Sequence, residues 1–235
     1  MFLSLFIAFS SILSAAVVPS QTVTTLQEVS KKGGVVAAAN LPEGMSGVVI
    51  RRFDEKHAAV IAAAVVKKST NESSEVEFRP FRLLPQHKLP TVKAEPKSGD
   101  RIILGYLYDR VLPIVPNGRS FQKAKESFGG LTLIHPDLFA VELASDRDAL
   151  PHRNNFQKMC RKQHIGLVMF MFKDGTDFID CISWKRVAKS DVTAVSDELT
   201  APFYNRFGEI EPPFYDFSSY ELKDFDKFYK KVEGE

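Results

Sequence analysis

Two cysteines and two histidines have the spacing in this sequence that most resembles a chemical site. Cys160 and His164 are one helical turn apart, as metal ligands can be, and His152 and Cys181 flank them. Zinc is disfavoured because there is no CxxC pair and no His-rich segment. A cysteine nucleophile would need an orienting partner, and Asp180 beside Cys181 forms no known motif. We therefore expect packing residues, with no catalytic or metal-binding residue; a hydrolase using Cys160 or Cys181 is the weaker alternative.

The same cysteines could also pair with each other. Cys160 and Cys181 are 21 positions apart, and closing such a loop in an oxidising compartment stabilises a fold by roughly 3 kcal/mol. Cys160 lies in a helical pattern and Cys181 at the end of a strand pattern. Because a sequence does not give their separation, a disulfide and two inert buried side chains both remain open, with the second favoured.

The beginning of the sequence indicates export. Residues 1–18 are apolar except for four serines, and the first charged residue is Glu28. Ser14, Ala15 and Ala16 supply small residues for a signal peptidase, so we predict a signal peptide over residues 1–16 and a location in the periplasm, outer membrane or cell surface. The alternative is an uncleaved membrane anchor over residues 1–18, which is short for a span of about 20 residues.

Composition excludes several functional classes. The 235 residues include 31 Lys and Arg and 29 Asp and Glu, which gives a net charge of +2. The strongly basic surface of a nucleic-acid-binding protein is therefore not expected. Two cysteines exclude a disulfide-dense scaffold. Gly44–Gly47 lacks the Gly-Lys-Ser/Thr ending of a phosphate-binding loop, so we expect no cofactor.

The elements that follow the leader predict an α+β protein of two modules. From Thr22 to Phe81, short apolar runs alternate with turn signals, which is typical of a small β-barrel. Prolines break the pattern between Arg79 and Asp100, and a closing strand is expected over 101–108. We assign residues 17–112 to this barrel-like module.

Residues 113–201 are predicted to form a mixed α+β module. Helices are expected over 120–128, from 137 to 143, and from a cap at Asn154 or Asn155 to about His164. Residues 165–172 are a continuous apolar run, typical of a strand buried on both faces. Asp174-Gly175 predicts a hairpin turn before a return strand over 178–182.

Residues 202–235 are rich in aromatic and charged side chains. The aromatic residues are expected to pack back on the second module as a strap. Phe225, Phe228 and Tyr229 fall at near-helical spacing, so a short amphipathic helix is expected near the end of the sequence.

Several short segments occur in a distinctive order and spacing: Gly44–Ile50 with Phe53–His57, Tyr106–Arg110 with Ile114–Asn117, Ile134–Ala140, Ile165–Val168, Asp180–Cys181 and Pro202–Tyr204. Together they resemble the N-terminal domain of the plasminogen-binding protein A family of Helicobacter- and Campylobacter-type epsilonproteobacteria, and the resemblance covers nearly the whole chain after the leader. It implies an exported, non-enzymatic surface protein that captures host plasminogen. The alternative is a periplasmic envelope scaffold that does not bind plasminogen.

The chemistry of such capture directs attention to lysines. Kringle domains bind lysine in a groove with an acidic end, an aromatic floor and a basic end. The resemblance implies that longer members present a terminal lysine, whereas this sequence ends in Gly234-Glu235. The best internal candidates are Lys227, Lys230 and Lys231, accompanied by the acids Asp224, Asp226 and Glu233.

Overall fold

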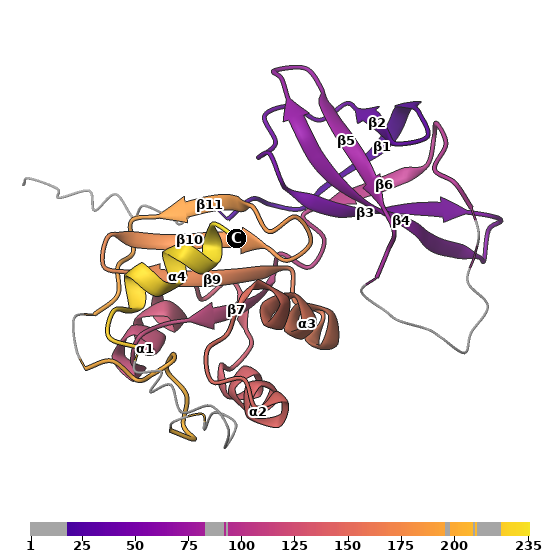
Figure 1. The fold of residues 1–235 in the computed structure, drawn as a ribbon. Helices are drawn as coiled ribbons and strands as arrows, with labels where there is room; N and C mark the ends of the chain where they lie inside the picture. The colour runs from indigo at the N-terminus through magenta and orange to yellow at the C-terminus, as the bar shows by residue number, and fades with distance from the viewer. Residues whose placement is uncertain (1–17, 83–91, 93, 196–197, 209, 211–221) are drawn as a thin grey trace, which may run out of the picture.

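The first module is a closed barrel. The computed structural model describes residues 18–82, 92, 94–195, 198–208, 210 and 222–235. The barrel consists of six strands, which are hydrogen-bonded in the closed order β1-β2-β5-β4-β3-β6; Figure 1 shows these strands. They are β1 (Thr22–Val29), β2 (Gly33–Val36), β3 (Ser46–Arg52), β4 (Ala58–Ser69), β5 (Ser74–Arg79) and β6 (Arg101–Leu104).

Small side chains allow the barrel to close. Its interior is filled by aliphatic residues such as Val49, Ala64 and Val66, all nearly inaccessible to solvent. At Gly47, a Cβ atom would lie only 2.2 Å from the carbonyl oxygen of Ile103, so glycine permits β3 to approach β6. Because these inward-facing side chains fill the interior, the barrel has a packed core rather than a channel.

The second module is a five-stranded sheet with helices on both faces, in the strand order β11-β10-β9-β7-β8. Strand β7 is parallel to β8 and β9, while β9, β10 and β11 are antiparallel neighbours. Its elements are β7 (Arg110–Ile114), α1 (Gly118–Ser127), β8 (Thr132–Leu133), α2 (Asp137–Asp146), α3 (Arg153–Gln163), β9 (Leu167–Phe172), β10 (Gly175–Asp180), β11 (Arg186–Ser190) and α4 (Phe225–Glu233).

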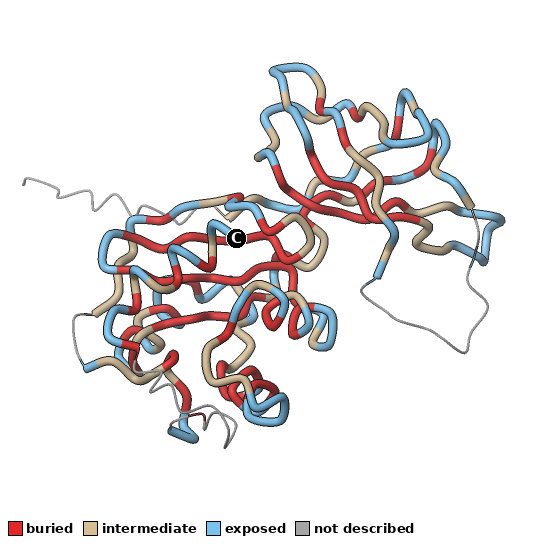
Figure 2. Tube along the Cα trace, viewed as in Figure 1, coloured by how far each residue is buried: buried red, intermediate tan, exposed pale blue. Residues whose placement is uncertain are grey.

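Alternate residues of the central strand divide the core into two layers. Val168, Phe170 and Phe172 of β9 face a cluster that includes residues from α2, α3 and α4. Leu167 and Met169 face α1 and belong to a cluster that continues into the barrel. Every residue of β9 is buried (Figure 2), as the continuous apolar run predicts.

The α+β fold with a barrel-like first module is confirmed. The expected helices correspond to α1, α2 and α3, and the expected hairpin corresponds to β9 and β10. Strand β7 crosses the predicted module boundary at residue 112 and pairs in the second sheet. The predicted leader over 1–16 and part of the predicted connector lie outside the described residues.

Three local predictions were wrong. The strand expected over 101–108 ends at Leu104, because Gly105 and Leu107 adopt positive φ angles and turn the chain. The return strand ends at Asp180 rather than Ile182, because the Asp180 carboxylate accepts hydrogen bonds from the next backbone amides. The cap of α3 is His152, and Asn155 instead accepts the His152 amide hydrogen from inside the first turn.

Candidate functional site

Helix α4 carries all three predicted lysines. Its N-cap is Asp224, whose carboxylate accepts a hydrogen bond from the Lys227 amide at 3.0 Å. Phe225, Tyr229 and Val232 are buried along one side, while Lys227, Lys230 and Lys231 are exposed. The amphipathic helix expected from the aromatic spacing is present, and it displays its lysines on the outside of the fold.

Aromatic and polar contacts fix α4 against the second module. Tyr229 is fully buried, stacks on Phe170 with ring centroids 5.4 Å apart, and donates its hydroxyl hydrogen to the Pro202 carbonyl at 2.9 Å. Burial raises the pKa of Tyr229 well above its usual value. Trp184 donates its indole N–H to the Val232 carbonyl at 3.0 Å. These contacts therefore attach α4 to the second module.

Lys230 differs from its two neighbours because its ammonium group is already engaged. Its Nζ lies 2.7 Å from Oδ2 of Asp174 and 5.2 Å from the centre of the Phe172 ring. The hydrogen bond with Asp174 raises the pKa of Lys230 and lowers that of Asp174. Lys227 and Lys231, four residues apart on α4, form no ion pair with any described residue. Of the three predicted lysines, Lys227 and Lys231 are therefore the two whose ammonium groups have no ion-pair partner among the described residues.

The carboxylates of the three acids near these lysines differ in the contacts that they already make. Asp226 accepts a hydrogen bond from the Lys173 amide at 3.0 Å. Glu233 points toward Arg186 of β11, with Nη1 and Oε1 3.5 Å apart. Asp224 is exposed and uses one oxygen to cap α4, so it is the least engaged of the three acids near Lys227 and Lys231 among the described contacts.

The structure joins Cys160 of α3 to Cys181, which follows β10, in a disulfide with a Cα–Cα distance of 6.1 Å. Neither sulfur is therefore a thiolate that could bind zinc or attack a substrate. His152 caps the N-terminus of α3 and His164 adopts the left-handed conformation that ends it. Among the described residues, no group of three or more His, Cys, Asp and Glu side chains is placed to hold a metal ion.

Sequence reasoning missed a buried polar cluster that joins the modules. The Asp180 carboxylate accepts hydrogen bonds from the Tyr108 hydroxyl at 2.8 Å and from the backbone amide and hydroxyl of Ser46 in the barrel. Burial raises the pKa of Asp180 and of Tyr108. The segments that carry the family resemblance include all three residues, but the sequence does not show that they meet, because Ser46 and Asp180 are 134 positions apart.

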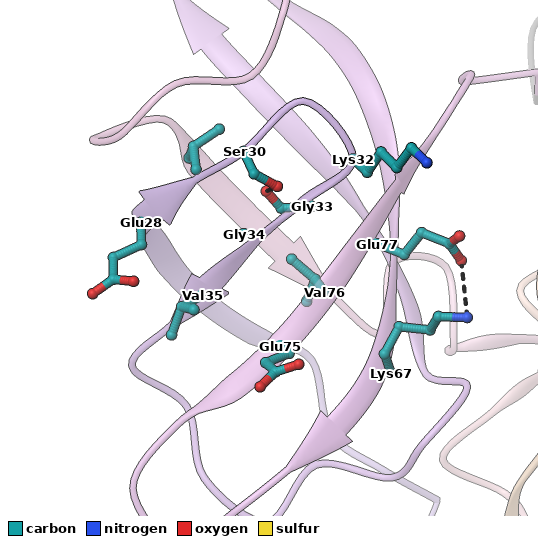
Figure 3. Close-up of a pocket in the computed structure, with 11 residues that line it drawn as sticks. Glu28, Ser30, Lys32, Gly33, Gly34, Val35, Lys67, Glu75, Val76 and Glu77 are labelled. Atoms are coloured by element: carbon teal, nitrogen blue, oxygen red, sulfur yellow. Dashed lines mark hydrogen bonds and ion pairs between the residues drawn. The ribbon is translucent and has the colours of Figure 1, made fainter.

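A depression of about 460 Å³ lies on the barrel beside the glycine pair of β2 (Figure 3). Its charged side chains have both signs, and Lys67 lies 3.4 Å from Glu77. Because opposite charges line this surface, it has no strong preference for an anion or a cation. We do not assign a function to it.

Comparison with known protein families gives a match over nearly the whole described chain. The family model described as "Plasminogen-binding protein pgbA N-terminal" matches residues 21–232. The chain belongs to this family. The match covers both modules and nearly all of α4.

Curated relatives of this family are proteins named plasminogen-binding protein PgbA from two strains of Helicobacter pylori, 26695 and J99. Each is 22% identical to this chain over 175 residues, which are 74% of the chain and 38% of the relative. The chain thus matches less than two fifths of the length of these relatives. No solved structure matches it. Among the described residues, no helix is long and apolar enough to cross a membrane.

Proposed function

We propose that this member of the PgbA family is an exported, non-enzymatic surface protein that captures plasminogen through Lys227 and Lys231. The observation that carries the proposal is the family match over residues 21–232, which includes both lysines. The relatives' names supply the partner. The geometry of α4 supplies the residues, because both side chains are exposed and their ammonium groups are unpaired among the described residues.

The proposed contact follows from the chemistry of a lysine-binding groove. The ammonium group of Lys227 or Lys231 enters the acidic end, and its alkyl stem lies on the aromatic floor. Asp224, one turn before Lys227, is placed to face the basic end. Lys230 contributes little, because capture would require breaking its ion pair with Asp174.

Surface plasmon resonance with immobilised protein and soluble plasminogen tests this proposal. The K227A/K231A variant is expected to lose at least about tenfold in affinity, since each charged contact contributes about 1.5–3 kcal/mol. An excess of the lysine analogue 6-aminohexanoate should abolish binding of the original protein. The matched control is K31A/K56A, which removes two exposed barrel lysines and should bind normally.

Two outcomes would contradict the proposal. Binding that persists in excess analogue excludes the lysine groove, and equal loss in both double variants excludes a specific role for α4. Surface biotinylation of intact cells tests export separately. A protein that is exported but shows no plasminogen binding would instead fit the alternative of a periplasmic envelope scaffold.

A further inference from the structure

A cleft of about 280 Å³ opens between the barrel and helix α3. Arg79, at the end of β5, and Arg82, shortly after it, line the barrel side. Arg161 and Gln157 of α3 line the opposite side. The cleft is therefore formed by two modules whose sequences are far apart, and neither module contains it alone.

The charged side chains lining this cleft are all positive. Arg79 is paired with Glu77, with Nη2 and Oε2 3.2 Å apart. Arg82 and Arg161 are exposed and form no ion pair with any described residue. Because Glu77 compensates Arg79, the unbalanced positive charge at this hollow comes from Arg82 and Arg161, and it attracts an anion placed between them. In the depression on the barrel, by contrast, the charges compensate one another.

The rest of the cleft wall is less polar. The Cys160–Cys181 disulfide and Ile182 contribute to it. Gln157 donates its side-chain N–H to the Cys181 carbonyl at 3.4 Å, which orients its amide at the wall. A ligand that fills this space therefore needs an anionic group next to a hydrocarbon group.

The position of the cleft is fixed before any ligand arrives. Asp180 precedes Cys181 and accepts hydrogen bonds from Ser46 of the barrel and from Tyr108. This buried cluster holds the two walls at the level of the disulfide. Because the walls are already held, binding has to order mainly the exposed side chains of Arg82 and Arg161.

We propose that this cleft, lined by Arg82 and Arg161, binds a carboxylate of an acidic peptide segment whose neighbouring apolar side chain lies against Ile182 and the disulfide. The planar guanidinium fork matches a carboxylate. The apolar wall favours a peptide over free phosphate, which has no hydrocarbon. This site is separate from the lysines of α4, and it does not depend on plasminogen capture.

Fluorescence anisotropy tests the proposal with the full chain and a fluorescein-labelled peptide of alternating glutamate and leucine. Binding should be saturable and should weaken with added salt. R82Q and R161Q should each lower the affinity about tenfold. The matched control R52Q removes an exposed arginine at the end of β3, outside the cleft, and should change affinity less than about twofold.

The same experiment contains the results that would overturn the proposal. Equal losses in R82Q, R161Q and R52Q would show only general attraction to a basic surface. Unchanged binding of a peptide with glutamine in place of glutamate would exclude carboxylate recognition, and inorganic phosphate binding as tightly as the peptide would exclude the peptide assignment. The K227A/K231A variant should retain peptide binding, which separates this site from that of the proposed function.

Discussion

The barrel is filled mainly with aliphatic side chains, whereas one face of the sheet module is filled with aromatic rings. Val49, Ala64 and Val66 represent the barrel interior. On the face of the second sheet that α2, α3 and α4 cover, the core instead contains the rings of Phe139, Phe156, Phe170, Phe172, Phe203, Trp184 and Tyr229. The two modules therefore distribute their packing energy differently: the barrel over many small contacts, the second module over a few large ones.

Closure explains the difference. A barrel of six strands satisfies its backbone groups all round, and its interior is filled mainly by aliphatic side chains, from Ala64 and Val49 up to Leu26 and Met45. The open second sheet has edges at β8 and β11 and needs helices over its faces. Large rings fill the wider space between sheet and helices. The comparison predicts that single truncations are tolerated better in the barrel.

Truncation of Phe156 should give the largest effect. Its ring lies within 4.7 to 6.4 Å of those of Phe139, Phe170, Trp184 and Tyr229, centroid to centroid. F156A should lower the free energy of unfolding by about 3–5 kcal/mol, whereas V49A in the barrel should cost about 2 kcal/mol. Urea unfolding followed by circular dichroism measures both. Equal losses of unfolding free energy in F156A and V49A would contradict the prediction that truncations are tolerated better in the barrel.

How much of this could be predicted from the sequence differs between the modules. Barrel strands were recognisable because short apolar runs and turn residues are local signals, and β9 was recognisable because it is apolar throughout. Strand β11 was missed because Arg186–Ser190 contains few apolar residues; its pairing with β10 supplies what its own sequence lacks.

The candidate sites show the same limit. The lysines of α4 could be named from sequence, but not the ion pair that separates Lys230 from Lys227 and Lys231, since Asp174 is 56 positions away. The Cys160–Cys181 pair was left open because its geometry is tertiary. The arginine cleft was not foreseen, because its walls come from different modules.

The disulfide provides the second test of the comparison, because only the sheet module contains one. C160A/C181A removes the constraint on a loop of 21 residues and should lower the free energy of unfolding by about 3 kcal/mol. Amide hydrogen exchange should show faster opening around α3 and β10 with little change in the barrel strands. Uniform acceleration in both modules would instead show that they unfold together.

The third test concerns a carboxyl pair beneath α4, a feature that the barrel lacks among its described residues. Asp177 of β10 is buried and lies 3.1 Å from Nη1 of Arg186, the same nitrogen that Glu233 of α4 approaches at 3.5 Å. The second oxygen of Asp177, Oδ1, has no hydrogen-bond donor among the described residues. Burial and the charge of Asp177 raise the pKa of Glu233 to about 7, although Arg186 and Lys230 oppose the shift. A protonated Glu233 can therefore share its hydrogen with Asp177.

The sign of the resulting pH dependence follows from this raised pKa. Between the usual value of 4.5 and about 7, the native state holds more protons than the unfolded state, so stability falls as pH rises through this range. Because Glu233 is only partly shielded from water, we expect a loss of about 1–2 kcal/mol between pH 5 and 8. Trp184, the only tryptophan of the sequence, donates to Val232 of α4, so its fluorescence reports on this helix.

Glu233→Gln isolates the contribution of this pair. The glutamine amide can donate a hydrogen bond to Asp177 at every pH. The free energy of unfolding of E233Q should therefore not show the loss of about 1–2 kcal/mol between pH 5 and 8 that we expect from Glu233. Comparing variants by urea unfolding removes the background of other groups, including His135, whose pKa is lowered by burial. The matched control E75Q, an exposed barrel carboxylate, should follow the original protein. If E233Q and E75Q show the same pH profile, the carboxyl pair does not set the stability of the α4 contact. The contact would then depend on the aromatic packing of α4 and on its other polar contacts, such as the Trp184–Val232 and Tyr229–Pro202 hydrogen bonds.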